Sequence, residues 1–120
     1  MVKINRFSFR KENRQIEKEL ARSLLLIQGY PIPENTAAEM IRRSTLRDNE
    51  RFKFIMSQAV KALNGAYDMG AHDDSPERDE IFRSTIEQNC RKAFKCLRQA
   101  SWDAFYAGLK AKEVSDGSNK

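Results

Sequence analysis

The chain has few of the residues that stabilise small secreted or metal-bound domains: two cysteines, one histidine and three prolines among 120 residues. On one helix, Cys90 and Cys96 would lie about 9 Å apart along the axis, whereas a disulfide needs Cα atoms within about 7 Å. Two thiols and one imidazole without CxxC or HxxxH spacing do not make a zinc site. We therefore expect a reduced cytoplasmic or nuclear protein without metal or cofactor. An intermolecular bridge between two copies is the alternative use of the thiols.

Long apolar runs are also missing. The longest uninterrupted aliphatic run covers residues 24–27, far short of the roughly 20 residues of a membrane span. No apolar signal-peptide core follows the first residues. The mean hydropathy of −0.71 and the charged fraction of 32% favour a soluble protein that does not enter a membrane. The length favours one domain, because chains below roughly 150 residues seldom hold two cores.

Basic residues outnumber acidic ones unevenly along the chain. There are 22 Lys and Arg against 17 Asp and Glu, which gives a net charge of +5. Residues 1–64 carry 13 cations and 7 acids, whereas residues 68–80 carry six acids against Arg78. Opposite charges in separate segments suit docking on a charged partner.

Apolar residues recur at the three- and four-residue spacing of helices that bury one face. Ile16, Leu20, Leu24 and Ile27 form one such face, and Gly29 is a typical residue after a helix end. Thr36 with Glu39 fits a capping box, Asp48 fits an N-cap, and Ser75-Pro76 fits a helix start. These signals predict helices over 11–28, 36–45, 48–64 and 76–112.

The sequence therefore predicts an all-α fold of about four helices, in a small bundle or helical-hairpin array with a long C-terminal helix. Residues 1–112 would form a single helical domain, with 1–10 as an N-terminal arm and 113–120 as a disordered tail. A break near Ser101 would divide the long helix into two.

A stripe of cations is predicted on the first helix, nearly opposite its apolar face. Rotation by 100° per residue aligns Lys11, Arg14, Lys18 and Arg22. The stripe could contact phosphates, or it could be an ordinary solvated face. Glu12, Glu17 and Glu19 lie on its flanks and are expected to weaken its field.

A second stripe on the last helix is basic at one end and aromatic at the other. Cations beside stacking rings suit single-stranded or irregular nucleic acid, and also suit a protein hot spot. Alternatively, the rings pack on the N-terminal arm and only the cations are exposed. The binding candidates on this stripe are Arg91, Lys95, Arg98, Trp102 and Tyr106.

Residues 36–61 resemble a helix-turn-helix in outline, with an ordinary αα-hairpin as the alternative. In the first case Arg51, Phe54 and Lys61 would face outward on the second helix as a further binding patch. Phe54 lies outside the predicted core face in either case.

The acidic stretch around His72 contains the only carboxylate cluster. Acids beside a helix N-terminus are favoured by the helix dipole alone. No phosphate-binding loop, EF-hand or nucleophile motif accompanies them. We therefore expect neither enzyme activity nor a metal site.

Three functions remain open. The first is a nucleic-acid-associated regulator or small subunit of a nucleoprotein complex, binding DNA or RNA through the two cationic stripes. The second is a protein-binding adaptor or inhibitor that docks on an acidic partner. The third is a helical homo-oligomer, for instance a homodimer, joined along the small residues Ala100, Ala104 and Gly108.

Overall fold

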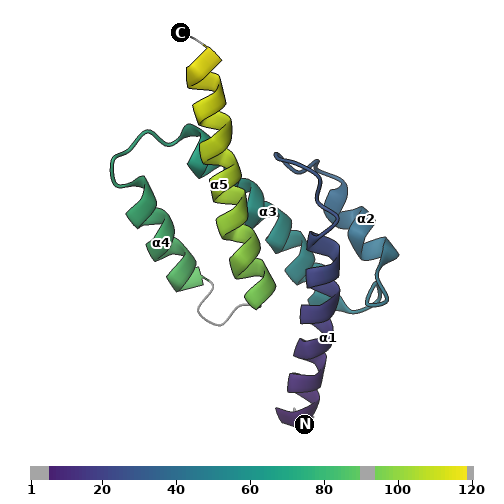
Figure 1. The fold of residues 1–120 in the computed structure, drawn as a ribbon. Coiled ribbons are helices and arrows are strands. Elements are labelled where there is room, and N and C mark those ends of the chain that lie inside the picture. Colours follow the sequence, from purple (N-terminus) through teal and green to yellow (C-terminus); the bar gives the residue numbers. More distant parts are fainter. Residues whose placement is uncertain (1–5, 90–93, 119–120) are drawn as a thin grey trace.

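The computed structural model describes residues 6–89 and 94–118, with side chains described for 10–88 and 94–114. These residues form five helices and no strand, so the predicted all-α fold is confirmed (Figure 1). None of the described helices is long and apolar enough to cross a membrane. The helices are α1 (Arg6–Leu24), α2 (Thr36–Arg43), α3 (Glu50–His72), α4 (Arg78–Asn89) and α5 (Lys95–Ser118).

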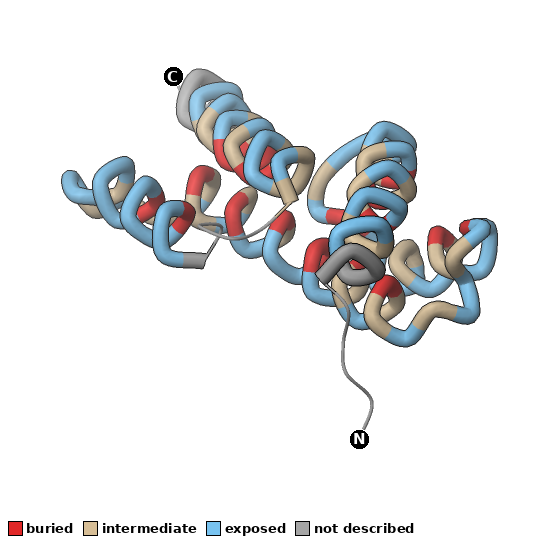
Figure 2. The backbone as a smooth tube through the Cα atoms, turned by 90° about the horizontal axis from the view of Figure 1, so that it is seen from below, coloured by how far each residue is buried: buried red, intermediate tan, exposed pale blue. Residues whose placement is uncertain are grey.

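Helix α3 is the central element of the fold. Its most extensive contact is with α5, and α2 and α4 also pack against it, while α1 packs against α5. The buried positions lie on the inward sides of the helices (Figure 2). The predicted core faces of α1 and α3 are confirmed at their central positions, since Ile16, Leu20, Phe52, Met56 and Leu63 are fully buried.

Helices α3 and α5 cross at two glycines. A Cβ atom built on Gly108 would overlap the carbonyl oxygen of Tyr67, and one built on Gly70 would overlap the carbonyl oxygen of Phe105. The two backbones are therefore in direct contact, which only glycine permits. The small residue Gly108, which could have joined two copies of the chain, thus allows two helices of the same chain to approach closely.

The molecule is elongated, with principal extents of 63 × 29 × 19 Å and a radius of gyration of 16.3 Å. A compact chain of this length would have a radius of gyration of about 14 Å. Figure 1 shows the first turns of α1 extending past the neighbouring helix ends. Among the described side chains of α1, which begin at Arg10, the first that is fully buried is Ile16.

The single long helix predicted over 76–112 is wrong. Two helices, α4 and α5, occupy this region, and α5 passes through Ser101 without the predicted break. The physical reason is the burial of Phe82. On one straight helix Phe82 and Phe105 would be about 35 Å apart, whereas in the structure their rings stack with centroids 4.2 Å apart.

Several predicted helix ends also differ from the structure. Helix α1 begins at Arg6, so residues 6–10 are helical and not an arm, and it ends at Leu24. Helix α3 continues through Gly65 to His72 because burial of Ala66 and Gly70 beyond it outweighs the roughly 1 kcal/mol cost of a helical glycine. Helix α5 extends to Ser118, into the predicted tail.

The predicted caps are displaced by one residue. The N-cap of α2 is Asn35, and Glu39 pairs with Arg42 and Arg43 and forms no capping box. The N-cap of α3 is Asn49, whose Oδ1 accepts a hydrogen bond from the amide of Phe52 at 2.8 Å. Asparagine is as good an N-cap residue as aspartate and a better one than threonine, so residue preference does not favour the predicted positions over their neighbours.

Candidate functional site

Every described cation of α1 is exposed. Among these cations, only Arg22 forms an ion pair with a described side chain, that of Glu19 at 3.8 Å. All five cations face solvent, on an arc of about 120° around the helix. We call this set the α1 basic face: Arg10, Lys11, Arg14, Lys18 and Arg22.

The three acids of α1 lie outside this arc of cations, and each contacts the end of a different helix. Glu12 Oε1 accepts a hydrogen bond from Nδ2 of Asn49, the N-cap of α3, at 3.4 Å. Glu17 Oε1 accepts from the amide of Cys96, in the first turn of α5, at 3.1 Å. Glu19 Oε2 accepts from the hydroxyl of Ser44, the C-cap of α2, at 2.8 Å. All three acids are half-buried.

The prediction that these acids weaken the field of the cationic stripe stays in place, and one of them, Glu19, lies 3.8 Å from Arg22. The side chain of Glu19 is only 13% exposed, whereas that of Arg22 is 69% exposed. The hydrogen bond from Ser44 lowers the pKa of Glu19, so this carboxylate stays ionised while it joins α1 to α2. The acids hold α1 to the other helices, and the solvent side of α1 is basic over its described length.

Arg10 belongs to this face although it was not predicted. The sequence contains its signal, because Arg10, Arg14, Lys18 and Arg22 follow one another at intervals of four residues. It was missed because residues 1–10 were expected to form an arm.

The cations of the second stripe lie partly beside α1. Lys95 and Arg98 are exposed on the first turn of α5, and Cys96 between them is bonded to Glu17 of α1. This contact brings the start of α5 against the middle of α1. Arg91 lies outside the described residues, before the first residue of α5.

The aromatic end of the second stripe is partly used in the core. Trp102 is half-buried and packs edge-on against Phe82 of α4, with ring centroids 4.8 Å apart. Trp102 thus packs on α4; residues 1–5 of the predicted N-terminal arm lie outside the described residues. Tyr106 stacks on Trp102 at 5.8 Å and is 57% exposed, so it is the ring that this stripe presents to solvent.

The second predicted patch on α3 is divided. Phe54 is 65% exposed, which confirms that it lies outside the core, and Lys61 is also exposed. Arg51 is half-buried, so the three side chains do not form one free surface. A helix-turn-helix function for residues 36–61 stays a prediction.

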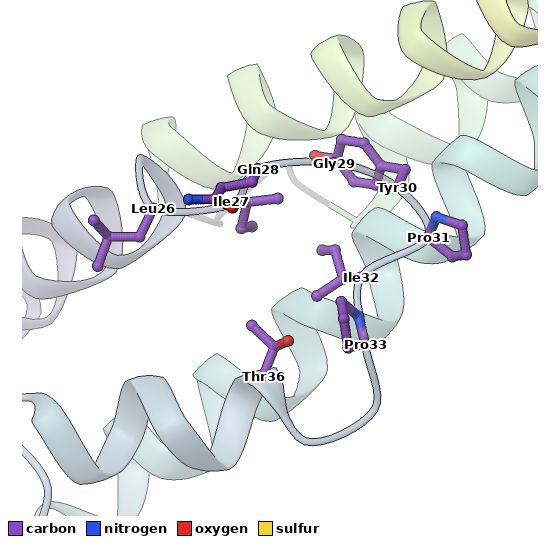
Figure 3. A pocket seen from close by; sticks show the side chains of 9 residues that line it. All are labelled: Leu26, Ile27, Gln28, Gly29, Tyr30, Pro31, Ile32, Pro33 and Thr36. Atoms are coloured by element: carbon purple, nitrogen blue, oxygen red, sulfur yellow. The ribbon is translucent and has the colours of Figure 1, made fainter.

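Two hollows in the surface are mainly apolar. One, of about 460 Å³, lies between the end of α1 and the start of α2 (Figure 3), and Tyr30 is the only titratable side chain in its lining. The other, of about 540 Å³, lies between α3, α4 and α5. Neither lining contains the convergent acids, bases or nucleophiles that catalysis requires.

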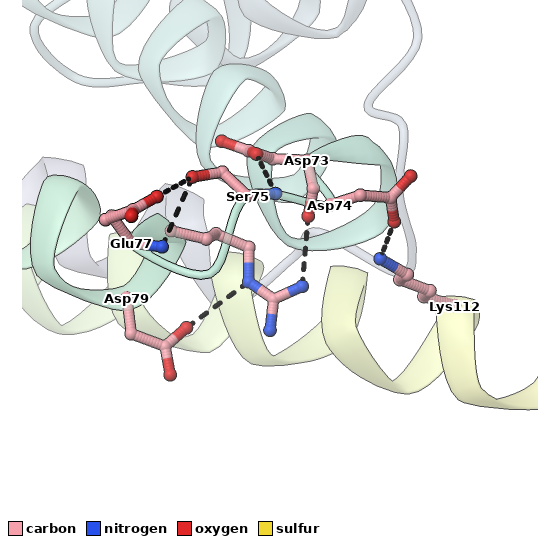
Figure 4. A network of polar contacts seen from close by, with 7 residues as sticks. Asp73, Asp74, Ser75, Glu77, Asp79 and Lys112 are labelled. Atoms are coloured by element: carbon pink, nitrogen blue, oxygen red, sulfur yellow. Dashed lines mark hydrogen bonds and ion pairs between the residues drawn. The ribbon is translucent and has the colours of Figure 1, made fainter.

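The acidic segment is a helix start and not a ligand cluster (Figure 4). Asp73 Oδ1 accepts from the amide of Ser75 at 2.8 Å, and the Ser75 hydroxyl lies 2.7 Å from Glu77 Oε2. Asp74 pairs with Lys112, whose hydrogen bond lowers the pKa of the Asp74 carboxyl. Within the described residues, no three His, Cys, Asp or Glu side chains are grouped so as to hold a metal ion.

Cys96 is expected to be unreactive in the folded chain. Burial, with the nearby Glu17 carboxylate, raises the pKa of its thiol from 9.0 to about 12. In a Cys90→Ser variant at pH 8, we expect Cys96 to react with a disulfide reagent at least about 100-fold more slowly than a free cysteine.

The same shift predicts the pH dependence of folding. Because the folded pKa is raised, the contribution of this thiol to stability is complete below the unfolded value and is lost as the pH rises from 9.0 towards about 12. Reaction of Cys96 at the rate of the urea-unfolded chain would contradict the described contact between α5 and α1.

Comparisons with protein-family models, with curated proteins and with solved structures found no match to this chain. The α1 basic face and its surroundings are therefore the features of the molecule that indicate a function.

Proposed function

We propose that the chain is a non-enzymatic nucleic-acid-binding module, acting as a regulator or small subunit of a nucleoprotein complex, and that it binds through the α1 basic face. One observation carries this proposal. The five described cations of α1 face solvent, while its three acids are bonded to other helices. The exposed charged side chains of α1 are thus all basic, while residues 10–22 as a whole carry five cations and three acids.

Such a face suits a polyphosphate backbone for a physical reason. Each phosphate neutralised by a lysine or arginine releases a condensed counterion, and this release drives binding without any sequence readout. Exposed cations lose little hydration on such contact, and those of α1 are held at fixed spacing by the helix. Lys95 and Arg98, at the start of α5 beside α1, extend the same surface.

An acidic protein surface is the second candidate partner. The α1 basic face would steer such a partner by charge, and the exposed rings of Phe54 and Tyr106 are of the type found in protein hot spots. Homodimerisation along Ala100, Ala104 and Gly108 is no longer favoured, because α3 of the same chain covers Gly108.

A salt titration tests the proposal. We expect a fluorescent random-sequence oligonucleotide to bind with a log–log salt slope of about −3.6 to −4.5, for four to five phosphate contacts. Between about 50 and 200 mM salt, the affinity should fall by roughly 150- to 500-fold.

The proposal is abandoned if neither DNA nor RNA binds at about 50 mM salt. If the chain binds an acidic protein and neither DNA nor RNA, an acidic protein surface is favoured as the partner.

A further inference from the structure

We propose that α1 enters the major groove of B-form DNA, so that double-stranded DNA is the ligand of the α1 basic face. This inference rests on the proposed function and narrows it to one class of nucleic acid. It follows from the shape of α1, from the order of the cations around it and from the side chains that this face lacks.

The shape of α1 leaves its first turns accessible on their outer side. These turns extend past the neighbouring helix ends in Figure 1, and Arg10, Lys11, Arg14 and Gln15 are exposed on them. A helix with its side chains is about 10–12 Å across, and the major groove is about 12 Å wide. The accessible part of α1 can therefore enter the groove while the rest of the molecule stays outside.

The cations are ordered around α1 as groove binding requires. Arg14 and Lys18 lie near the middle of the exposed arc, and Arg10 and Arg22 lie at its two edges. With the middle of the arc facing the groove floor, the edge residues reach the phosphates of the two strands. From Arg10 to Arg22 the face is about 18 Å long, which corresponds to about five base pairs at 3.4 Å each.

The side chains at the groove floor would be suited to reading bases. Arginine and lysine bind the O6 and N7 acceptors of guanine. Arg14 and Lys18 are both exposed, and neither forms an ion pair with another described side chain.

The other nucleic acids fit this face less well. Proteins that bind single strands stack bases on aromatic rings, and none of the described side chains of α1, residues 10–24, is aromatic; Phe7 and Phe9 precede them. The exposed rings of Phe54 and Tyr106 belong to α3 and α5. The major groove of A-form RNA is deep and narrow and does not admit a helix.

The test compares four probes of equal length with the full chain at about 50 mM salt. These are unmodified duplex DNA, single-stranded DNA, duplex RNA and duplex DNA in which every cytosine carries a glucosylated 5-hydroxymethyl group. The sugar fills the major groove and leaves the phosphates and the minor groove unchanged. This probe responds to groove entry in every binding register, so no specific site has to be known.

We expect unmodified duplex DNA to bind at least about tenfold more tightly than each of the other three probes. Equal affinity for the glucosylated duplex would mean that α1 contacts phosphates only, and would overturn this inference while the proposed function stands. Equal or tighter binding of single strands or duplex RNA would overturn it in the same way. No binding to any probe would overturn both.

Discussion

Replacing Lys11, Arg14, Lys18 and Arg22 together by glutamine is expected to weaken binding to duplex DNA by at least about 100-fold at about 50 mM salt. The log–log salt slope should become less negative by up to about 3.6, the value for one phosphate neutralised by each of the four cations. Glutamine is nearly as good a helix former as lysine or arginine, and all four positions are exposed. The unfolding midpoint should therefore remain close to that of the unchanged chain.

A matched variant separates a local face from overall charge. Arg42, Arg43, Arg83 and Lys110 are equally exposed but lie on α2, α4 and α5. Their replacement by glutamine removes the same charge, and it should leave most of the salt slope in place. If the two quadruple variants lose affinity equally, net charge governs binding and the α1 basic face has no special role.

Gly108→Ala is expected to destabilise the fold by about 3 kcal/mol or more. The new Cβ would overlap the Tyr67 carbonyl oxygen and lie 2.8 Å from the amide nitrogen of Ala71. Both atoms belong to the backbone of α3, so no side chain can rotate away to make room. Thermal unfolding followed by circular dichroism should show a midpoint lower by at least about 10 °C.

Gly65→Ala is the matched control for this prediction. Gly65 also lies inside a helix, but a Cβ atom there would have no neighbour within 4 Å. Alanine should stabilise this position by about 0.5–1 kcal/mol, because it reduces the freedom of the unfolded chain. A Gly108→Ala variant that is as stable as the unchanged chain would contradict direct backbone contact between α3 and α5.

The sequence predicted helix faces better than helix ends. The spacing of Ile16 with Leu20, and of Phe52 with Met56, identified residues that are fully buried, because a helix that packs on one side must repeat its apolar positions. The division of this region into α4 and α5 was missed because no glycine or proline marks it. It follows from the stacking of Phe82 on Phe105, a contact between distant residues that local patterns do not contain.

The candidate site was predicted only in part, because a helical wheel orders residues around one helix but does not give their contacts with other helices. The wheel placed Lys11, Arg14, Lys18 and Arg22 on one side of a helix, and the structure has all four exposed. It could not assign partners to Glu12, Glu17 and Glu19, which depend on the ends of three other helices. Those partners hold the three acids half-buried, so the exposed charged side chains of α1 are all basic.

The most direct test of the central claim is to map the bound surface by nuclear magnetic resonance, for which a chain of 13.9 kDa is well suited. Addition of duplex DNA to the labelled chain should shift the backbone amide signals of residues 10–22 most. The signals of α4 should change little, because this helix lies on the far side of α3 and α5. Shifts concentrated on α3 or α4, with α1 unaffected, would contradict the assignment of the α1 basic face as the nucleic-acid surface.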